Sequence, residues 1–166
     1  VRKVFRDKAN GNTGIPAMLD DIALLADALL EVPGDSEIQA ASLIESLISM
    51  AIENYHDTGD GYFYFSRDSD TTLIVRKKET QDTVIPSSCS VMARVLFQQG
   101  IRTGDQHYIE LSERMLNGMR TSLLQYPLSF AGWGNLLLES ATPENILKGL
   151  SGLSGPHCSP DGICNI

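Results

Sequence analysis

The stretch MLDDIALLADALLEVPGDSEIQAASLIESLISMAIENY, residues 18–55, decides the fold class of this chain. Its apolar residues recur every three or four positions over residues 18–32, which is the periodicity of an amphipathic helix. A Pro-Gly pair ends that helix, and Ser36 with Gln39 has the spacing of the capping box that opens another one. Because helices joined by such a short turn pack antiparallel, these residues predict an αα-hairpin.

The segment that follows has a different pattern. Residues 56–61 are rich in turn formers, and the aromatic run over 62–65 and the β-branched run over 71–75 are both β-prone. We therefore expect a small β-hairpin at about 61–76.

Helical periodicity returns after this segment. One helix is expected to follow Pro86 and to stop at Gly100, and Asp105 is a suitable N-cap for the next. A fifth helix is expected over residues 130–141, and a short sixth begins at Pro143. The chain is thus predicted to be mainly all-α, built of consecutive antiparallel αα-hairpins.

The composition excludes several classes of protein. The 166 residues include 13 Lys and Arg against 21 Asp and Glu, which gives a net charge of −8. Since proteins that bind nucleic acid without sequence preference neutralise phosphates with Lys and Arg, no nucleic-acid partner is expected. No apolar run approaches the ~20 residues of a membrane-spanning helix, so no membrane partner is expected either. A chain of this length can bury one core, and one domain is predicted.

The cysteines indicate a reducing compartment. Three of them are too few, and odd in number, for a disulfide-stapled secreted domain, so a cytoplasmic location is expected. Cys158 and Cys164 lie near the C-terminus among Gly and Pro residues, and we interpret them as thiols of a flexible tail, 154–166. Their spacing differs from that of structural zinc sites, so no metal site is predicted, although a disulfide between them is an alternative. Cys89 is predicted to be a small, partly buried hydrophobic residue.

Three segments resemble a known family. Residues 18–23 (MLDDIA) resemble a G-x-L-[DE]-D-Y-A helix start, and residues 59–65 (GDGYFYF) are similar to a G-G-F-F strand. Residues 82–91 (DTVIPSSCSV) are similar to a D-G-A-x-P-S-G-N-S-V segment, although Thr83, Ser88 and Cys89 depart from it. Together they resemble the C-terminal portion of the YyaL-like proteins, also called spermatogenesis-associated thioredoxin-domain proteins.

This resemblance implies a larger protein, in which a thioredoxin-like domain precedes an (α/α)6 toroid. The toroid is of the six-hairpin glycosidase and N-acylglucosamine 2-epimerase type. Residues 1–153 would form part of it, residues 154–166 would be a flexible tail, and the thioredoxin-like domain and the remaining hairpins would be absent from this chain. Those missing parts are the expected partners. Because a partial toroid would expose apolar helix faces, self-association is also expected.

Three carboxylates are candidate catalytic residues: Asp20, Asp21 and Asp82. Two carboxylates that face one cavity can act as general acid and general base on a sugar, and a small saccharide is the expected ligand in that case. In the alternative interpretation, Asp20 and Asp21 lie at a helix N-terminus, where backbone N–H groups and the helix dipole stabilise a negative charge.

Four further residues are candidates for substrate binding: Ser87, Ser88, Tyr62 and Trp133. One of the serines after Pro86 is also expected to cap the helix that begins there. The two aromatic side chains can stack on a sugar face or pack in the core. No glycine-rich nucleotide-binding motif occurs, so no cofactor is predicted.

Three functions stay open on the sequence alone. The first is a toroid portion of uncharacterised, carbohydrate-related function that needs the missing hairpins. The second is a sugar-processing enzyme, an epimerase or a glycoside hydrolase, that uses the paired carboxylates. The third is a helical scaffold or binding domain without catalysis.

Overall fold

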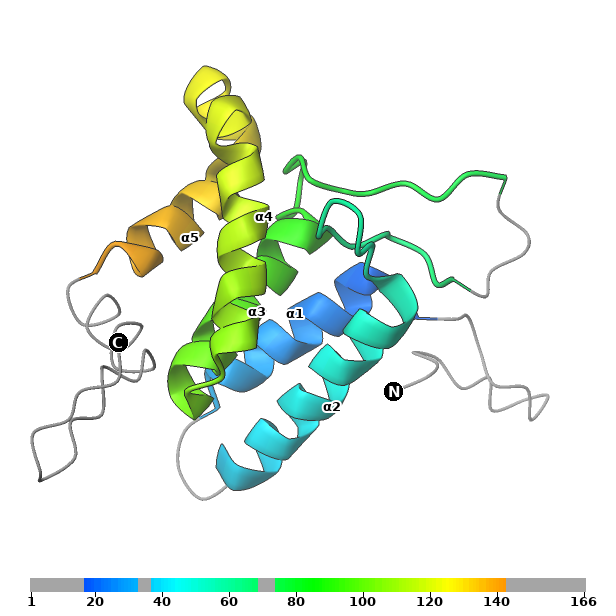
Figure 1. Cartoon of the computed structure of the whole chain (residues 1–166), viewed down its shortest axis with the longest axis vertical. Helices are drawn as coiled ribbons and strands as arrows, with labels where there is room; N and C mark the ends of the chain where they lie inside the picture. Colours follow the sequence, from blue (N-terminus) through cyan, green and yellow to red (C-terminus); the bar gives the residue numbers. More distant parts are fainter. Residues whose placement is uncertain (1–16, 33–36, 69–73, 143–166) are drawn as a thin grey trace, which may run out of the picture.

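The computed structural model describes residues 17–32, 37–68 and 74–142 of the chain (Figure 1). Five α-helices and one 3-10 helix occupy most of these ranges, and no β-strand is found within them. The helices are α1 (Leu19–Leu30), α2 (Glu37–Tyr55), α3 (Ser88–Thr103), α4 (Gln106–Gln125), η2 (Pro127–Phe130) and α5 (Ala131–Ser140). The prediction of a mainly all-α chain is confirmed for this part.

Helix α3 is the centre of the arrangement. It packs against α1, α4 and α5, while α2 packs against α1 (Figure 1). Eleven of its 16 residues are buried, so neighbours cover it on most sides. Small residues in its first half, among them Cys89, Ser90 and Ala93, let those neighbours approach closely. The other helices therefore take their positions from α3.

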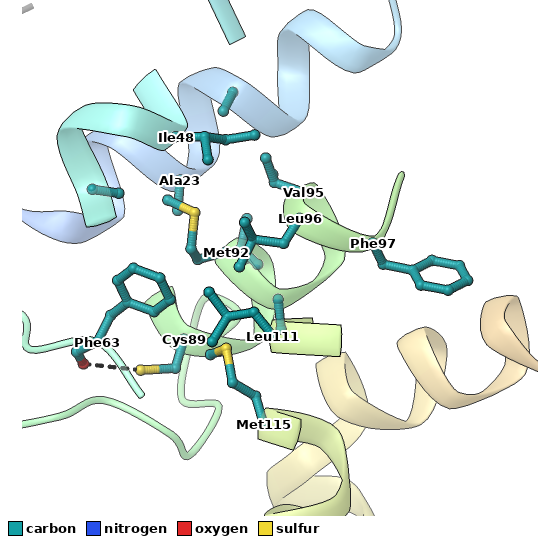
Figure 2. Packing of buried hydrophobic residues seen from close by; sticks show 14 of the residues in the cluster. Ala23, Ile48, Phe63, Cys89, Met92, Val95, Leu96, Phe97, Leu111 and Met115 are labelled. Carbon is teal, nitrogen blue, oxygen red and sulfur yellow. Dashed lines mark hydrogen bonds between the residues drawn. The ribbon is translucent and has the colours of Figure 1, made fainter. Parts of the chain in front are cut away.

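The hydrophobic core lies on both sides of α3. Figure 2 shows Met92 of α3 directed towards Ala23 of α1, with Ile48 of α2 close by. On the other side, Leu111 and Met115 of α4 lie near Cys89. All of these side chains are buried, and four helices thus contribute to one continuous cluster.

Helix α3 runs one turn further than the sequence predicts. We expected it to stop at Gly100, but it continues to Thr103 and ends at Gly104, whose φ of 76° suits the left-handed C-cap. Gly100 instead lies at a close helix crossing, where an added Cβ would be 2.7 Å from Ile109 Cγ1 of α4. The prediction for Asp105 is confirmed, because its side chain accepts the His107 backbone N–H at the start of α4.

No β-strand of the hairpin predicted at about 61–76 is found among the described residues of this segment. The aromatic run pairs with the end of α2: the Tyr64 backbone N–H donates to Tyr55 O over 2.8 Å, and a single antiparallel bridge joins His56 to Phe63. Phe63 is fully buried, and its entry into the core draws the run onto α2. Residues 69–73, which contain most of the predicted second strand, lie outside the described residues.

Two cations fix the long connection between α2 and α3. The Arg76 guanidinium donates to the backbone carbonyls of Ser66 (2.8 Å) and Asn54 (3.3 Å), and so ties the loop to the C-terminal turn of α2. Lys78 Nζ forms ion pairs with Asp57 (2.7 Å) and Asp60 (2.6 Å). The loop is therefore attached to the helices by charge-assisted hydrogen bonds as well as by its aromatic residues.

Some predictions fall on residues that the structure does not describe. These are the cap at Ser36, the sixth helix from Pro143, the tail at 154–166 and the cysteines Cys158 and Cys164.

The Gly100 crossing gives a test of this packing. Gly100→Ala is expected to lower the free energy of unfolding by about 1–3 kcal/mol, because its Cβ would clash with the Ile109 side chain and lie only 3.0–3.1 Å from backbone atoms of Asp105 and Ile109. Gly134→Ala is the matched control within α5, where the nearest atom, Leu123 Cδ1, is 3.5 Å away. There the better helix propensity should stabilise the protein by up to about 1 kcal/mol. Urea unfolding measures the free energy of unfolding of both variants. Equal changes in the two variants would contradict a close approach of α3 and α4 at Gly100.

Candidate functional site

The predicted catalytic pair, Asp20 and Asp21, lies in the first turn of α1. Asp21 Oδ2 accepts the backbone N–H of Met18 over 2.9 Å, which is one half of a capping box. Asp20 Oδ1 accepts the backbone N–H of Asp21 over 2.9 Å. Partial burial raises the pKa of Asp20, and the negative charges of Asp21 and Glu79 act in the same direction. Both carboxylates thus contribute to the start of a helix, as the alternative interpretation predicts.

Asp82 joins two helices that are far apart in sequence. Its Oδ1 accepts the backbone N–H of Ser87, the residue that caps α3, over 2.8 Å. Its Oδ2 accepts the backbone N–H of Gly132, in the first turn of α5, over 2.7 Å. Both N–H groups lie at helix starts, where no intrahelical acceptor exists. Each oxygen of this carboxylate therefore satisfies the beginning of a different helix.

The two candidate serines belong to the same helix start. Ser87 Oγ accepts the Ser90 backbone N–H over 3.2 Å, which confirms the prediction that a serine after Pro86 caps this helix. The Ser88 side chain is buried, and its Oγ has no hydrogen-bond partner among the described residues. Ser87 thus has a structural role at this helix start.

The candidate aromatic residues both pack against the core, and Tyr62 is only partly buried. The Trp133 side chain is fully buried, and its Nε1–H donates to Thr80 O over 2.8 Å. The Tyr62 hydroxyl donates to Met115 O over 2.8 Å and contacts α4 at Gly118, where an added Cβ would be 2.3 Å from Tyr62 Oη. The two rings meet edge to face with centroids 6.1 Å apart. These contacts are those of core packing between the loop, α4 and α5.

Two other reactive side chains lie near the loop, Cys89 buried and His56 partly buried. Cys89 is completely buried, with Sγ 3.2 Å from Phe63 O, so the prediction of a small hydrophobic role is confirmed and burial exceeds the expectation (Figure 2). Burial raises the pKa of the Cys89 thiol to about 11, which disfavours the nucleophilic thiolate. Burial also lowers the pKa of His56, whose Nε2 has no hydrogen-bond partner among the described residues.

Two of the hollows on the described part of the surface lie near these residues. The smaller, about 340 Å³, is formed by the 77–87 segment, and Ser87 lines it. The larger, about 450 Å³, lies between α1, α3 and α5 beside Pro86. The other candidate residues, namely Asp20, Asp21, Asp82, Ser88, Tyr62 and Trp133, line neither hollow. The structure therefore does not gather the candidate carboxylates around either of them.

Charged residues that the sequence analysis missed line the larger hollow. Arg94, Asp27 of α1 and Glu139 of α5 line it, and the Arg94 guanidinium bonds to Asp27 and to Glu139 (2.8 Å). The same guanidinium also bonds to Glu31 (3.4 Å), which lies just after α1 and does not line the hollow. Gln98 also donates to Glu139 over 2.8 Å. No sequence signal predicts this group, because helical periodicity relates residues of one helix and these come from three segments.

Two general findings bear on the described residues. No helix among them is long and apolar enough to cross a membrane. Within the same ranges, no group of three or more His, Cys, Asp or Glu side chains comes together in a way that could hold a metal ion.

The chain was also compared with known proteins. No model of a known protein family matches it, and no curated protein is similar to it.

Substitution of Asp82 tests its role directly. Asp82→Ala is expected to lower the free energy of unfolding by about 2–4 kcal/mol, because two backbone donors lose a charged acceptor. Asp82→Asn keeps one carbonyl oxygen and should lose about half as much. The control is Asp105→Ala, which removes a single N-cap bond at α4 and should cost about 1 kcal/mol. If urea unfolding showed that Asp82→Ala lowers the free energy of unfolding no more than Asp105→Ala does, the role of Asp82 in joining the starts of α3 and α5 would be contradicted.

Proposed function

We propose that this chain is a structural portion of a larger α/α toroid, from the C-terminal region of a YyaL-like, thioredoxin-domain-containing protein. In this role it builds a wall of the toroid and positions the loops at its mouth. The thioredoxin-like domain and the remaining hairpins are its proposed partners, and the proposed location is the cytoplasm. A carbohydrate-related function then belongs to the assembled protein.

The helix contacts support a toroid portion. Consecutive helices pack in pairs, α1 with α2 and α3 with α4, while α3 also contacts α1 and α5. Such a pattern is expected when the odd-numbered helices form one layer and the even-numbered helices cover it (Figure 1). The segment that resembles D-G-A-x-P-S-G-N-S-V connects to this layer, since it contains Asp82 and the start of α3.

A structural role is favoured over catalysis by one observation: both oxygens of Asp82 already accept backbone N–H groups at 2.7–2.8 Å. A general acid or base must be able to exchange a proton with a substrate atom within hydrogen-bond reach. Asp82, the first residue of one of the three resembling segments, instead accepts hydrogen bonds at two helix starts. These two bonds support the proposal that the segment around Asp82 has an architectural role.

One observation favours a second candidate, a sugar-processing enzyme. Partial burial raises the pKa of Asp20, and a raised pKa is what a carboxyl group needs to act as a general acid. In that case the chain would turn over a sugar substrate such as an aryl glycoside, and Asp20→Asn would abolish turnover. Asp20→Asn is the sharper variant for this purpose, because Asp82→Ala would also disturb the fold.

The structural role makes a prediction about association. Leu124 at the end of α4, Leu128 in η2 and Tyr126 between these helices are exposed. They form an apolar surface that a neighbouring hairpin would cover. Sedimentation velocity over a range of protein concentrations should show species heavier than one chain. Replacing Leu124 and Leu128 together by Glu should return the protein to a monomer. The control is Val84→Glu, in which an equally exposed apolar residue of the loop is replaced and association should persist.

A clean monomer of the unmodified chain at all concentrations would contradict the proposal. The same would hold if Val84→Glu dispersed the oligomer as well as the double variant does.

A further inference from the structure

We infer that His56 is a pH-sensitive switch for residues 57–65: the neutral imidazole allows this segment to attach to α2 and to the core, and an imidazolium weakens the attachment. This inference goes beyond the proposed function and does not depend on the toroid. It rests on the position of the ring, on the burial of one ring nitrogen, and on the charged groups that face the ring.

His56 lies at the point where the aromatic run joins α2. It directly follows the last residue of that helix and forms the antiparallel bridge with Phe63. The two rings lie close together, with centroids 5.0 Å apart. Phe63 is fully buried, and its backbone carbonyl oxygen is 3.2 Å from Cys89 Sγ of α3 (Figure 2). A change of charge on the His56 ring therefore acts on the residue that anchors the run in the core.

One nitrogen of the ring is poorly placed to take up a proton. His56 Nε2 is shielded from solvent and has no hydrogen-bond partner among the described residues. Protonation there would create an N–H donor and a positive charge. A charged donor that meets neither water nor an acceptor is unfavourable in a protein interior. The donor would be satisfied if the ring reached water, and this requires residues 57–65 to move away from α2.

The charged groups around the ring do not offset this cost. Asp57 and Asp60, in the turn that follows His56, face the ring, and so does Arg114 of α4. The two carboxylates attract an imidazolium, but both already form ion pairs with Lys78, at 2.7 and 2.6 Å. The Arg114 guanidinium repels it. The neutral ring is therefore the form that suits the attached segment.

The direction of the pH dependence follows from the pKa of His56. Burial lowers this pKa below the ordinary value of 6.5, and the charge of Arg114 acts in the same direction. A hydrogen bond with the Gly61 backbone and the two carboxylates act in the opposite direction. In the released segment the ring meets water, so its pKa is higher there than in the attached segment. Attachment is therefore most stable above pH 6.5 and weakens as the pH falls through 6.5 towards the lowered value.

The neighbouring carboxylates titrate at more acidic pH. Hydrogen bonds with Lys78 lower the pKa of Asp57 and, against the opposing effect of burial, that of Asp60 from the ordinary value of 3.8. Both groups therefore keep their charge while His56 changes its own. A loss of attachment that occurs above about pH 5 is thus due to His56 and not to these carboxylates.

Amide hydrogen exchange of the complete chain tests the inference. The Asp57 N–H donates to Tyr62 O and the Tyr64 N–H donates to Tyr55 O, both over 2.8 Å, so these amides are protected while the segment is attached. Their protection, after division by the intrinsic exchange rates, should fall between about pH 7.5 and about pH 5, by about tenfold for each unit by which the pKa of His56 is lowered. Unchanged protection of both amides would overturn the inference.

Controls separate this effect from a general loss of stability. The Gly104 amide, which donates to Gly100 O at the end of α3, should keep its protection over the same pH range. His56→Gln removes the titrating group, and protection of the Tyr64 amide should then no longer depend on pH. His107→Gln is the matched change at an exposed position in the first turn of α4, and it should keep the full pH dependence. Full pH dependence in His56→Gln would overturn the inference.

A direct titration keeps the inference testable if His56→Gln weakens the attachment at every pH. The ring signals of His56 in the unmodified chain, followed by NMR, should titrate with a midpoint below 6.5. The backbone signals of residues 57–65 should change over the same pH range. A midpoint at or above 6.5, or a titration of His56 that leaves those backbone signals unchanged, would overturn the inference.

Discussion

The carboxylate of Asp82 accepts hydrogen bonds from the backbone of Ser87 and Gly132, and the arrangement around α3 depends on this pair of bonds. The first N–H precedes α3 and the second lies in the first turn of α5. Backbone donors at helix starts have no partner within the helix, so a buried start needs an acceptor from elsewhere. The Asp82 carboxylate supplies an acceptor to each of the two helices and so sets where both of them begin.

The rest of the connection between α2 and α3 extends this role. Trp133 lies one residue after Gly132, is fully buried, and bonds to Thr80, two residues before Asp82. The aromatic run reaches from the end of α2 to α4 through Tyr62. Polar bonds at the backbone and aromatic burial thus act on the same segment. A residue pattern that looks like a binding loop is explained by the need to hold four helices around one connection.

The sequence predicts the helices and their caps well, because both depend on local spacing. The apolar periodicity gives α1 and α2, and the N-caps Ser87 and Asp105 occur where short polar residues precede that periodicity. Prediction from the sequence fails where the local structure depends on a contact between residues that are far apart in the chain. Gly100 has the same signature as a helix terminator, but its actual role is a close approach to Ile109. The aromatic run is β-prone, yet Phe63 enters the helical core.

The same distinction explains the candidate site. Asp20 and Asp21 were open to a capping role because they lie near a predicted helix start, and the structure places them there. Asp82 lies in a loop, and local spacing contains nothing about Gly132, which is 50 residues away. Arg94 meets carboxylates from two other segments for the same reason.

The joining of α3 and α5 by Asp82 can be measured most directly by amide hydrogen exchange. Gly132 lies in the first turn of α5, so its N–H would be open to water if Asp82 did not accept it. The account predicts that the Gly132 amide exchanges as slowly as amides in the middle of α5, with the Ser87 amide similarly protected. Exchange of Gly132 at the rate of an unprotected loop amide would contradict it.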